Sequence, residues 1–79
     1  MSQVNQRVRQ LLSDVLGVPV EQIGEKATRD DFQNWDSAAN VQLLMAIEGE
    51  FGVTLSVDDA ADLLSVELIV AILTERGVS

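Results

Sequence analysis

The chain has 79 residues, enough for one small domain with a modest core, and 47% of them are hydrophobic. It contains no cysteine and no histidine, which excludes disulfides, thiolate nucleophiles, the usual zinc sites and a Ser-His-Asp triad. Its 13 acidic and 5 basic residues give a net charge of −8, which disfavours nucleic acid and anionic lipid and favours basic protein partners.

The apolar residues are spread along the chain and not gathered in one segment. No apolar run approaches the roughly 18 residues that a membrane-spanning helix needs. The first residues also lack the apolar core of a signal peptide. We therefore expect a cytoplasmic protein without a membrane span, and a single domain over residues 1–79.

The first predicted element is a helix that Ser2 caps and that Gly17 and Pro19 end. Its apolar residues recur with the i, i+4, i+7, i+8 spacing of one buried stripe. These residues are Val4, Val8, Leu11, Leu12, Val15 and Leu16.

A long loop follows over 17–36. Loops of this length usually bear on function or contain a short turn of helix. We expect such a turn from Thr28 to Phe32, and we expect Val20, Ile23 and Phe32 to anchor the loop to the core.

The second predicted helix runs from Ser37 to Phe51 and is apolar on two faces. At about 100° per residue, one arc collects the residues expected to face the core, which are Leu43, Leu44, Ile47 and Phe51. The other side carries Ala38, Val41 and Met45, beside Gln42, Glu48 and Gly49. The core explains only the first of these faces.

Two further helices complete the prediction. A short one spans Asp58 to Leu64 and begins at Ser56 or a neighbouring aspartate, and a longer one spans Ser65 to Arg76 and stops at Gly77. There is no strand pattern. The predicted fold is therefore all-α, a small four-helix bundle of three longer helices and one short helix.

Ser37 is the most informative residue, because it follows Asp36 at the start of the second helix. Backbone N–H groups at a helix start lack intrahelical partners, and the helix dipole favours anions there. A hydroxyl at this place can carry a phosphodiester. The ordinary alternative is that Asp36 is an N-cap and Ser37 merely the first helical residue. The two roles are compatible.

The residues around Ser37 resemble those of the discrete acyl carrier proteins. The resemblance lies in Trp-Asp-Ser at 35–37, the run from Val41 that ends Ala-Ile-Glu-Gly-Glu-Phe-Gly, and Leu64-Ser65-Val66, and it covers essentially the whole chain. In that family the serine after the aspartate bears a 4′-phosphopantetheine arm. A separate phosphopantetheinyl transferase attaches the arm from coenzyme A with the help of Mg²⁺, and Asp36 would help to position that metal.

The resemblance implies a carrier and not an enzyme. Acyl intermediates of fatty-acid, polyketide or related specialised biosynthesis would be held on Ser37 as thioesters, with no tight metal site in the free protein. The implied partners are the transferase and the enzymes that load, condense or transfer acyl groups, and the carrier is expected to be a monomer.

We interpret the second apolar face as the docking surface for those enzymes. Ala38, Val41 and Met45, together with Glu48, would meet basic patches on the partners. The competing interpretation packs Val41 and Met45 under the long loop. The other acids are expected to form a solvated surface made of Glu21, Glu25, Asp30, Asp31, Asp58, Asp59 and Asp62.

Three residues depart from the carrier pattern. Ala38 stands where leucine is usual, Asn40 replaces the frequent Asp or His, and Gly49 stands where Glu is common. We place all three on the outward side of the second helix, which indicates changed partners and an unchanged fold.

Two other functions stay open. One is an unmodified, carrier-like acidic domain that only binds a basic partner, and the altered Ala38 supports it. The other is an aminoacyl carrier, for example for D-alanine. A stand-alone enzyme is disfavoured because no acid–base pair can be named.

Overall fold

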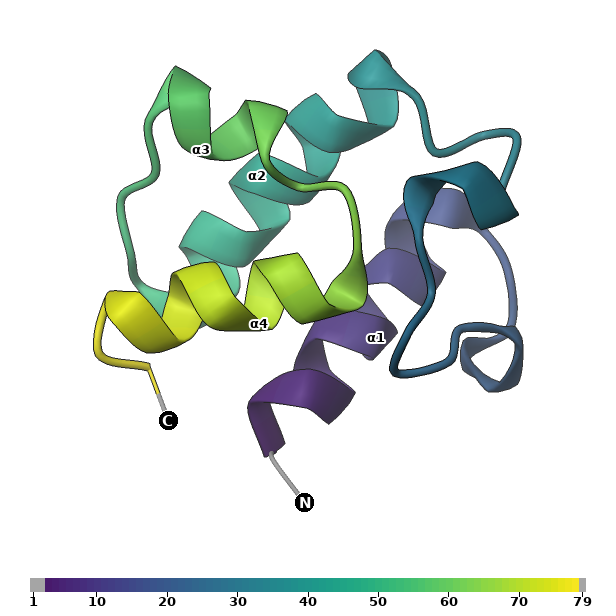
Figure 1. Cartoon of the computed structure of the whole chain (residues 1–79), viewed down its shortest axis with the longest axis horizontal. Coiled ribbons are helices and arrows are strands. Elements are labelled where there is room, and N and C mark those ends of the chain that lie inside the picture. The colour runs from purple at the N-terminus through teal and green to yellow at the C-terminus, as the bar shows by residue number, and fades with distance from the viewer. Residues whose placement is uncertain (1–2, 79) are drawn as a thin grey trace.

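Four α-helices form the described part of the chain, residues 3–78, in the computed structural model (Figure 1). They are α1 (Gln3–Leu16), α2 (Ser37–Phe51), α3 (Val57–Ala61) and α4 (Val66–Glu75), with two 3-10 helices, η1 (Val20–Gln22) and η2 (Arg29–Asp31). Residues 3–78 contain no strand, only an isolated bridge between Thr28 and Ser65. The predicted all-α bundle of three longer helices and one short helix is confirmed.

The core lies where α1 meets its two larger neighbours. α1 packs against both α2 and α4, and α3 packs against α2. Aliphatic side chains from these helices fill the interior, among them Val4, Val8, Leu12, Leu16, Leu43, Ile47, Ile69 and Leu73. None of the helices in residues 3–78 combines the length and the apolar character that crossing a bilayer requires.

The ends of α1 and α2 follow local signals in the sequence. Gly17 has φ of 70° and Gly52 has φ of 66°, a left-handed conformation that glycine adopts without steric cost, and each residue stops its helix. The stripe on α1 is confirmed, with Leu11 and Val15 only partly buried. The predicted cap Ser2 lies outside the described residues.

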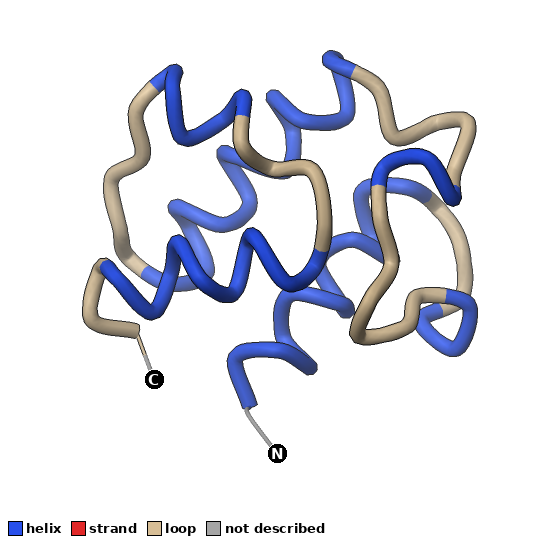
Figure 2. The backbone as a smooth tube through the Cα atoms, viewed as in Figure 1, coloured by secondary structure: helices blue, strands red, loops and turns tan. Residues whose placement is uncertain are grey.

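The loop between α1 and α2 contains the short helices η1 and η2 (Figure 2), and it is fixed to the core and to the segment before α4. The expected turn is η2, and Ile23 is fully buried, while Phe32 is only partly buried. Sequence analysis missed the main anchor, Trp35, which is 2% exposed. The backbone N–H of Arg29 also donates to the carbonyl of Leu64 at 2.8 Å, which fixes the loop to the segment before α4.

The third helix is shorter than predicted. It ends at Ala61 because the next N–H groups, of Asp62 and Leu63, bond to carbonyls three residues back, which tightens the chain. This tightening turns Leu63 into the core, where it is fully buried. Ser56 caps α3 as expected. The last helix agrees with its prediction, with Ser65 and Arg76 as its capping residues.

Candidate functional site

At the start of α2, the capping residue and the serine are two different residues. Asp36 is the N-cap, and its Oδ1 accepts a hydrogen bond from the backbone N–H of Ala39 at 2.9 Å. Ser37 is therefore the first helical residue, and it is exposed. Asp36 already makes the N-cap hydrogen bond of α2, so the hydroxyl of Ser37 is not needed as a cap.

A buried polar pair braces this helix start from behind. Trp35 Nε1 donates to Asn40 Oδ1 at 2.6 Å, and Asn40 Nδ2 donates to the carbonyl of Ala60 at 3.4 Å. Asn40 is only 6% exposed, so our prediction that it faces outward is wrong. Its position in the helical rotation lies beside Ile47, on the core side. The amide is tolerated there because the buried indole N–H requires an acceptor.

Arg29 is the residue of this site that sequence analysis missed. From η2 its Nε donates to the carbonyl of Trp35 at 2.8 Å, and its Nη2 lies 3.5 Å from Ser37 Oγ, the long limit of a hydrogen bond. The only signal in the sequence was its rarity, as one of five basic residues. It lies eight positions before Ser37, across the rest of η2 and a non-helical segment, so no periodic pattern brings the two together.

A groove of about 340 Å³ opens beside the serine, between α2 and α3. Ser37 and Arg29 line this α2–α3 groove, and Val57, 86% exposed, lines it from α3. Its lining residues are Arg29, Ser37, Asn40, Val41, Val57, Ala60 and Ala61. A chain attached to Ser37 would meet apolar atoms at once.

The outward face of α2 is solvent-exposed as the helical spacing predicts. Val41 is 56% exposed and Met45 60% exposed, and Ala38 is exposed as well, so the interpretation that packs the first two under the loop is wrong. Gly49 is also exposed. Glu48 differs from these residues: it is partly buried, and its Oε2 accepts the backbone N–H of Leu55 at 3.0 Å.

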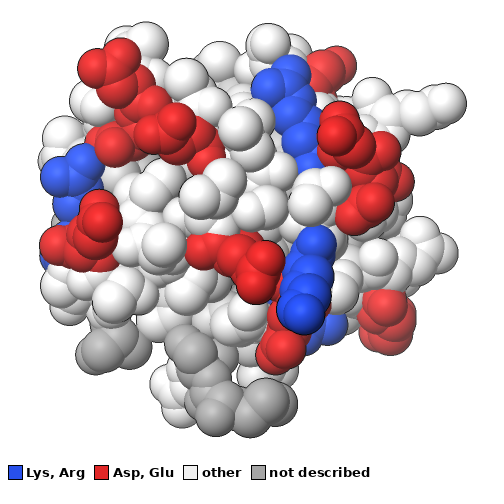
Figure 3. Space-filling view, in the orientation of Figure 1, with Lys and Arg blue, Asp and Glu red and all other residues white. Residues whose placement is uncertain are grey.

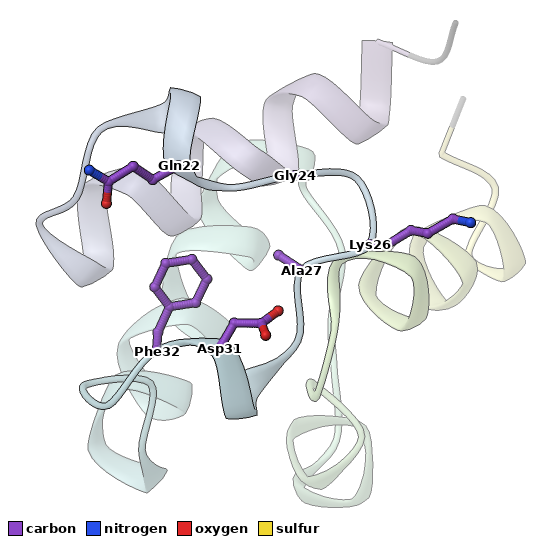
Figure 4. A pocket seen from close by; sticks show the side chains of 6 residues that line it. All are labelled: Gln22, Gly24, Lys26, Ala27, Asp31 and Phe32. Carbon is purple, nitrogen blue, oxygen red and sulfur yellow. The ribbon is translucent and has the colours of Figure 1, made fainter.

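Two further hollows lie elsewhere on the surface. One of about 430 Å³ lies between η1 and η2. There Asp31, at the end of η2, and the next residue, Phe32, project toward the facing stretch of loop, while Lys26 points away from both (Figure 4). The other, about 380 Å³, lies between η2 and the start of α4 and is lined in part by Arg29, Leu64 and Leu68. Ser37 lines neither.

Acidic side chains gather over α3 and over the α1–α2 loop (Figure 3). Two of the acids predicted to be merely solvated have structural partners. Asp31 accepts the backbone N–H of Thr28 at 2.9 Å, and Asp59 accepts that of Ser56 at 2.9 Å and pairs with Arg76. The Ser56 N–H, and then the Arg76 charge, hold the pKa of Asp59 below its ordinary value. Residues 3–78 contain no cluster of acids arranged to hold a metal ion.

Comparison with known proteins matches this chain over most of its length. The family model for the phosphopantetheine attachment site matches residues 6–73. Similar relatives include the acyl carrier protein of Sinorhizobium fredii (strain NBRC 101917 / NGR234) and the acyl carrier protein AcpP of Rhizobium meliloti (strain 1021). Each is 45% identical over 62 residues, which cover 78% of this chain and 78% of the relative.

Proposed function

Because the chain belongs to the acyl carrier protein family, whose members carry a 4′-phosphopantetheine arm and are carriers rather than catalysts, we propose that Ser37 bears this arm. One observation carries the proposal: the Ser37 hydroxyl is exposed at the first residue of α2, while Asp36 supplies the cap. Modification of the hydroxyl therefore costs the helix no capping hydrogen bond.

The surroundings of Ser37 fit a phosphodiester with a long organic tail. The N-terminus of α2, a helix of 15 residues, favours negative charge, and the guanidinium of Arg29 adds a full positive charge beside the hydroxyl. The α2–α3 groove offers apolar surface to the atoms that follow. When bound, the arm supplies a thiol that holds an acyl group as a thioester on a tether, which raises its effective concentration at a docked enzyme.

Attachment of the arm needs a second protein. Ser37 Oγ forms the new bond to phosphorus, the bond from that phosphorus to the nucleotide part of coenzyme A breaks, and the hydroxyl proton leaves. The chain has no histidine, and Arg29 can only donate hydrogen bonds. We assign the base to a phosphopantetheinyl transferase, in whose complex Asp36 helps to position Mg²⁺.

The outward face of α2 is the proposed docking surface for acyl-handling enzymes. Ala38, Val41 and Met45 place exposed apolar side chains on the helix that begins at Ser37. A net charge of −8 steers such a surface toward basic patches on loading, condensing and transfer enzymes. Glu48 lies at the edge of this face with its carboxylate committed to Leu55. The cargo is a fatty-acyl or polyketide unit, with an aminoacyl group as the alternative.

Loading with an acylated donor tests this function. The protein is incubated with acetyl-coenzyme A, Mg²⁺ and a broad-specificity transferase, and its intact mass is measured before and after neutral hydroxylamine. We expect one acetyl-phosphopantetheine on the wild type and on the matched control Ser65→Ala, none on Ser37→Ala, and removal of the acetyl group alone by hydroxylamine. A wild type that melts cooperatively but gains no mass with several transferases would favour the unmodified interaction domain.

A further inference from the structure

We propose that Arg29 is a positioning residue for the arm, because its guanidinium is placed to form an ion pair with the phosphodiester on Ser37. The inference rests on the proposed attachment at Ser37. It concerns the chain's own residues, and it predicts that the first atoms of the arm are held against η2 and do not move freely in solvent.

Arg29 is held in place from two sides. Its backbone N–H donates to the carbonyl of Leu64 at 2.8 Å, and its Nε donates to the carbonyl of Trp35 at 2.8 Å. Trp35 is itself buried and bonded to Asn40. The guanidinium is therefore anchored to the same buried pair that braces α2, and its orientation does not depend on the arm.

With Nε bonded to Trp35, one outer nitrogen of Arg29 lies beside the serine. Nη2 lies 3.5 Å from Ser37 Oγ. A phosphorus bonded to Oγ would carry its unesterified oxygens one bond further out, within hydrogen-bonding reach of Nη2. A guanidinium is always charged and matches phosphate geometry with paired N–H groups, so such contacts are among the stronger polar interactions.

No carboxylate competes for Arg29 among the described residues. The ion pairs of residues 3–78 are Arg7 with Glu50 and Arg76 with Asp59. The carboxylate of Asp31, in the same 3-10 helix, accepts the backbone N–H of Thr28. The positive charge beside Ser37 is thus available in a strongly acidic protein, which sets Arg29 apart from two of the other four cations.

Lys26 provides the internal comparison. It is the other cation of the α1–α2 loop downstream of η1, but it lines the hollow between η1 and η2 and points away from Asp31 and Phe32 (Figure 4). Arg29 instead lines both the α2–α3 groove and the hollow beside α4. An arm held at Arg29 would start beside a residue that lines both hollows.

Phosphorus NMR of the loaded protein tests this inference. We compare wild type, Arg29→Gln and the matched control Lys26→Gln, which removes the same charge from the same loop. Arg29→Gln should shift the ³¹P resonance and narrow it, because the phosphorus moves more freely, and Lys26→Gln should match the wild type. At about 1 M salt, where the Debye length is about 3 Å, the wild-type signal should move toward that of Arg29→Gln.

A second measurement uses the wild type alone, in case Arg29→Gln disturbs the loop. The side-chain nitrogen resonances of Arg29 are recorded before and after loading, and we expect the Nη signals to shift and their rotation to slow. Unchanged Arg29 signals, or identical ³¹P spectra in wild type and Arg29→Gln, would overturn the inference while Ser37 remains the attachment site. Failure of the wild type to gain mass would instead overturn the proposed function, and this inference with it.

Discussion

Within residues 3–78, three helices begin at or next to a serine, and the serine at α2 has a different role from those at α3 and α4. At α3, Ser56 Oγ accepts the backbone N–H of Asp59 at 3.1 Å. At α4, Ser65 Oγ accepts that of Leu68 at 3.1 Å. Both hydroxyls are capping groups. Modifying either one would remove a hydrogen bond that its helix needs.

At α2 the cap and the serine are separate residues. Asp36 accepts the backbone N–H of Ala39, and Ser37 stands one position later with its hydroxyl exposed. The described residues give that hydroxyl one polar neighbour, Arg29, at 3.5 Å. An Asp-Ser pair therefore keeps the serine at the electropositive helix start while the aspartate supplies the cap, so the hydroxyl has no capping role.

The largest expected loss of stability comes from disrupting the buried Trp35–Asn40 pair, which supports the start of α2. Asn40→Ala leaves the Trp35 indole N–H without its acceptor, and we expect a loss of about 2 kcal/mol in the free energy of unfolding. Urea unfolding followed by tryptophan fluorescence measures it. Gln42→Ala, on an exposed position of the same helix, is the control. Equal stability of the two variants would show that the Trp35–Asn40 hydrogen bond does not stabilise the start of α2.

Removing a capping side chain should destabilise the protein, whereas removing the Ser37 hydroxyl should not. Asp36→Ala and Ser65→Ala should each lose about 1 kcal/mol of unfolding free energy. Ser37→Ala should stay within about 0.5 kcal/mol of the wild type, because the hydroxyl caps nothing. Thermal and urea unfolding of the unmodified variants measure this difference. A Ser37→Ala variant as unstable as Ser65→Ala would mean that the hydroxyl is structural.

A substitution on the exposed face of α2 should impair transfer to a partner enzyme without lowering stability. Met45→Glu is expected to keep the unfolding free energy within about 0.5 kcal/mol, since the side chain is already 60% exposed. It should slow acyl transfer by a partner enzyme, because a charge replaces apolar contact surface. Gln6→Glu, on exposed α1 surface, adds the same charge elsewhere. Equal slowing by both variants would assign the effect to net charge and not to docking.

The smallest expected effect is a pH dependence at the start of α3. The pKa of Asp59 is lowered from its ordinary 3.8, so its stabilising contribution is present above that value and is lost as the pH falls through the lower, folded-state pKa. The difference in stability between wild type and Asp59→Asn should therefore stay constant from about pH 7 to about pH 5 and shrink as the pH falls further toward about 2. A difference that also stays constant over the lower part of this range would show that the Asp59 charge makes no contribution.

Sequence reasoning succeeded where the signals are local. The bounds of α2 follow from Asp36 and Gly52, a cap and a left-handed glycine directly at its ends. The exposure of Val41 and Met45 follows from helical rotation alone. The place of Ser37 as the first residue of α2 was predicted because its neighbours in the sequence mark the helix start.

Sequence reasoning failed where a residue's surroundings come from distant parts of the chain. Asn40 is polar, and its burial is explained only by Trp35 and Ala60. Arg29 reaches Ser37 because the loop pairs with the segment before α4, a contact across more than 30 residues with no periodic signature. The end of α3 was misplaced for the same reason, since Leu63 turns inward to meet the core of the whole bundle.

Attachment at Ser37 is tested most directly by locating the attached group among the three helix-start serines of residues 3–78. Loaded protein is cleaved, and its peptides are sequenced by fragmentation mass spectrometry. We predict that the whole phosphopantetheine mass lies on Ser37, with Ser56 and Ser65 unmodified. A phosphopantetheine found on Ser56 or Ser65, or an unmodified Ser37 in protein that has gained the mass, would contradict the account.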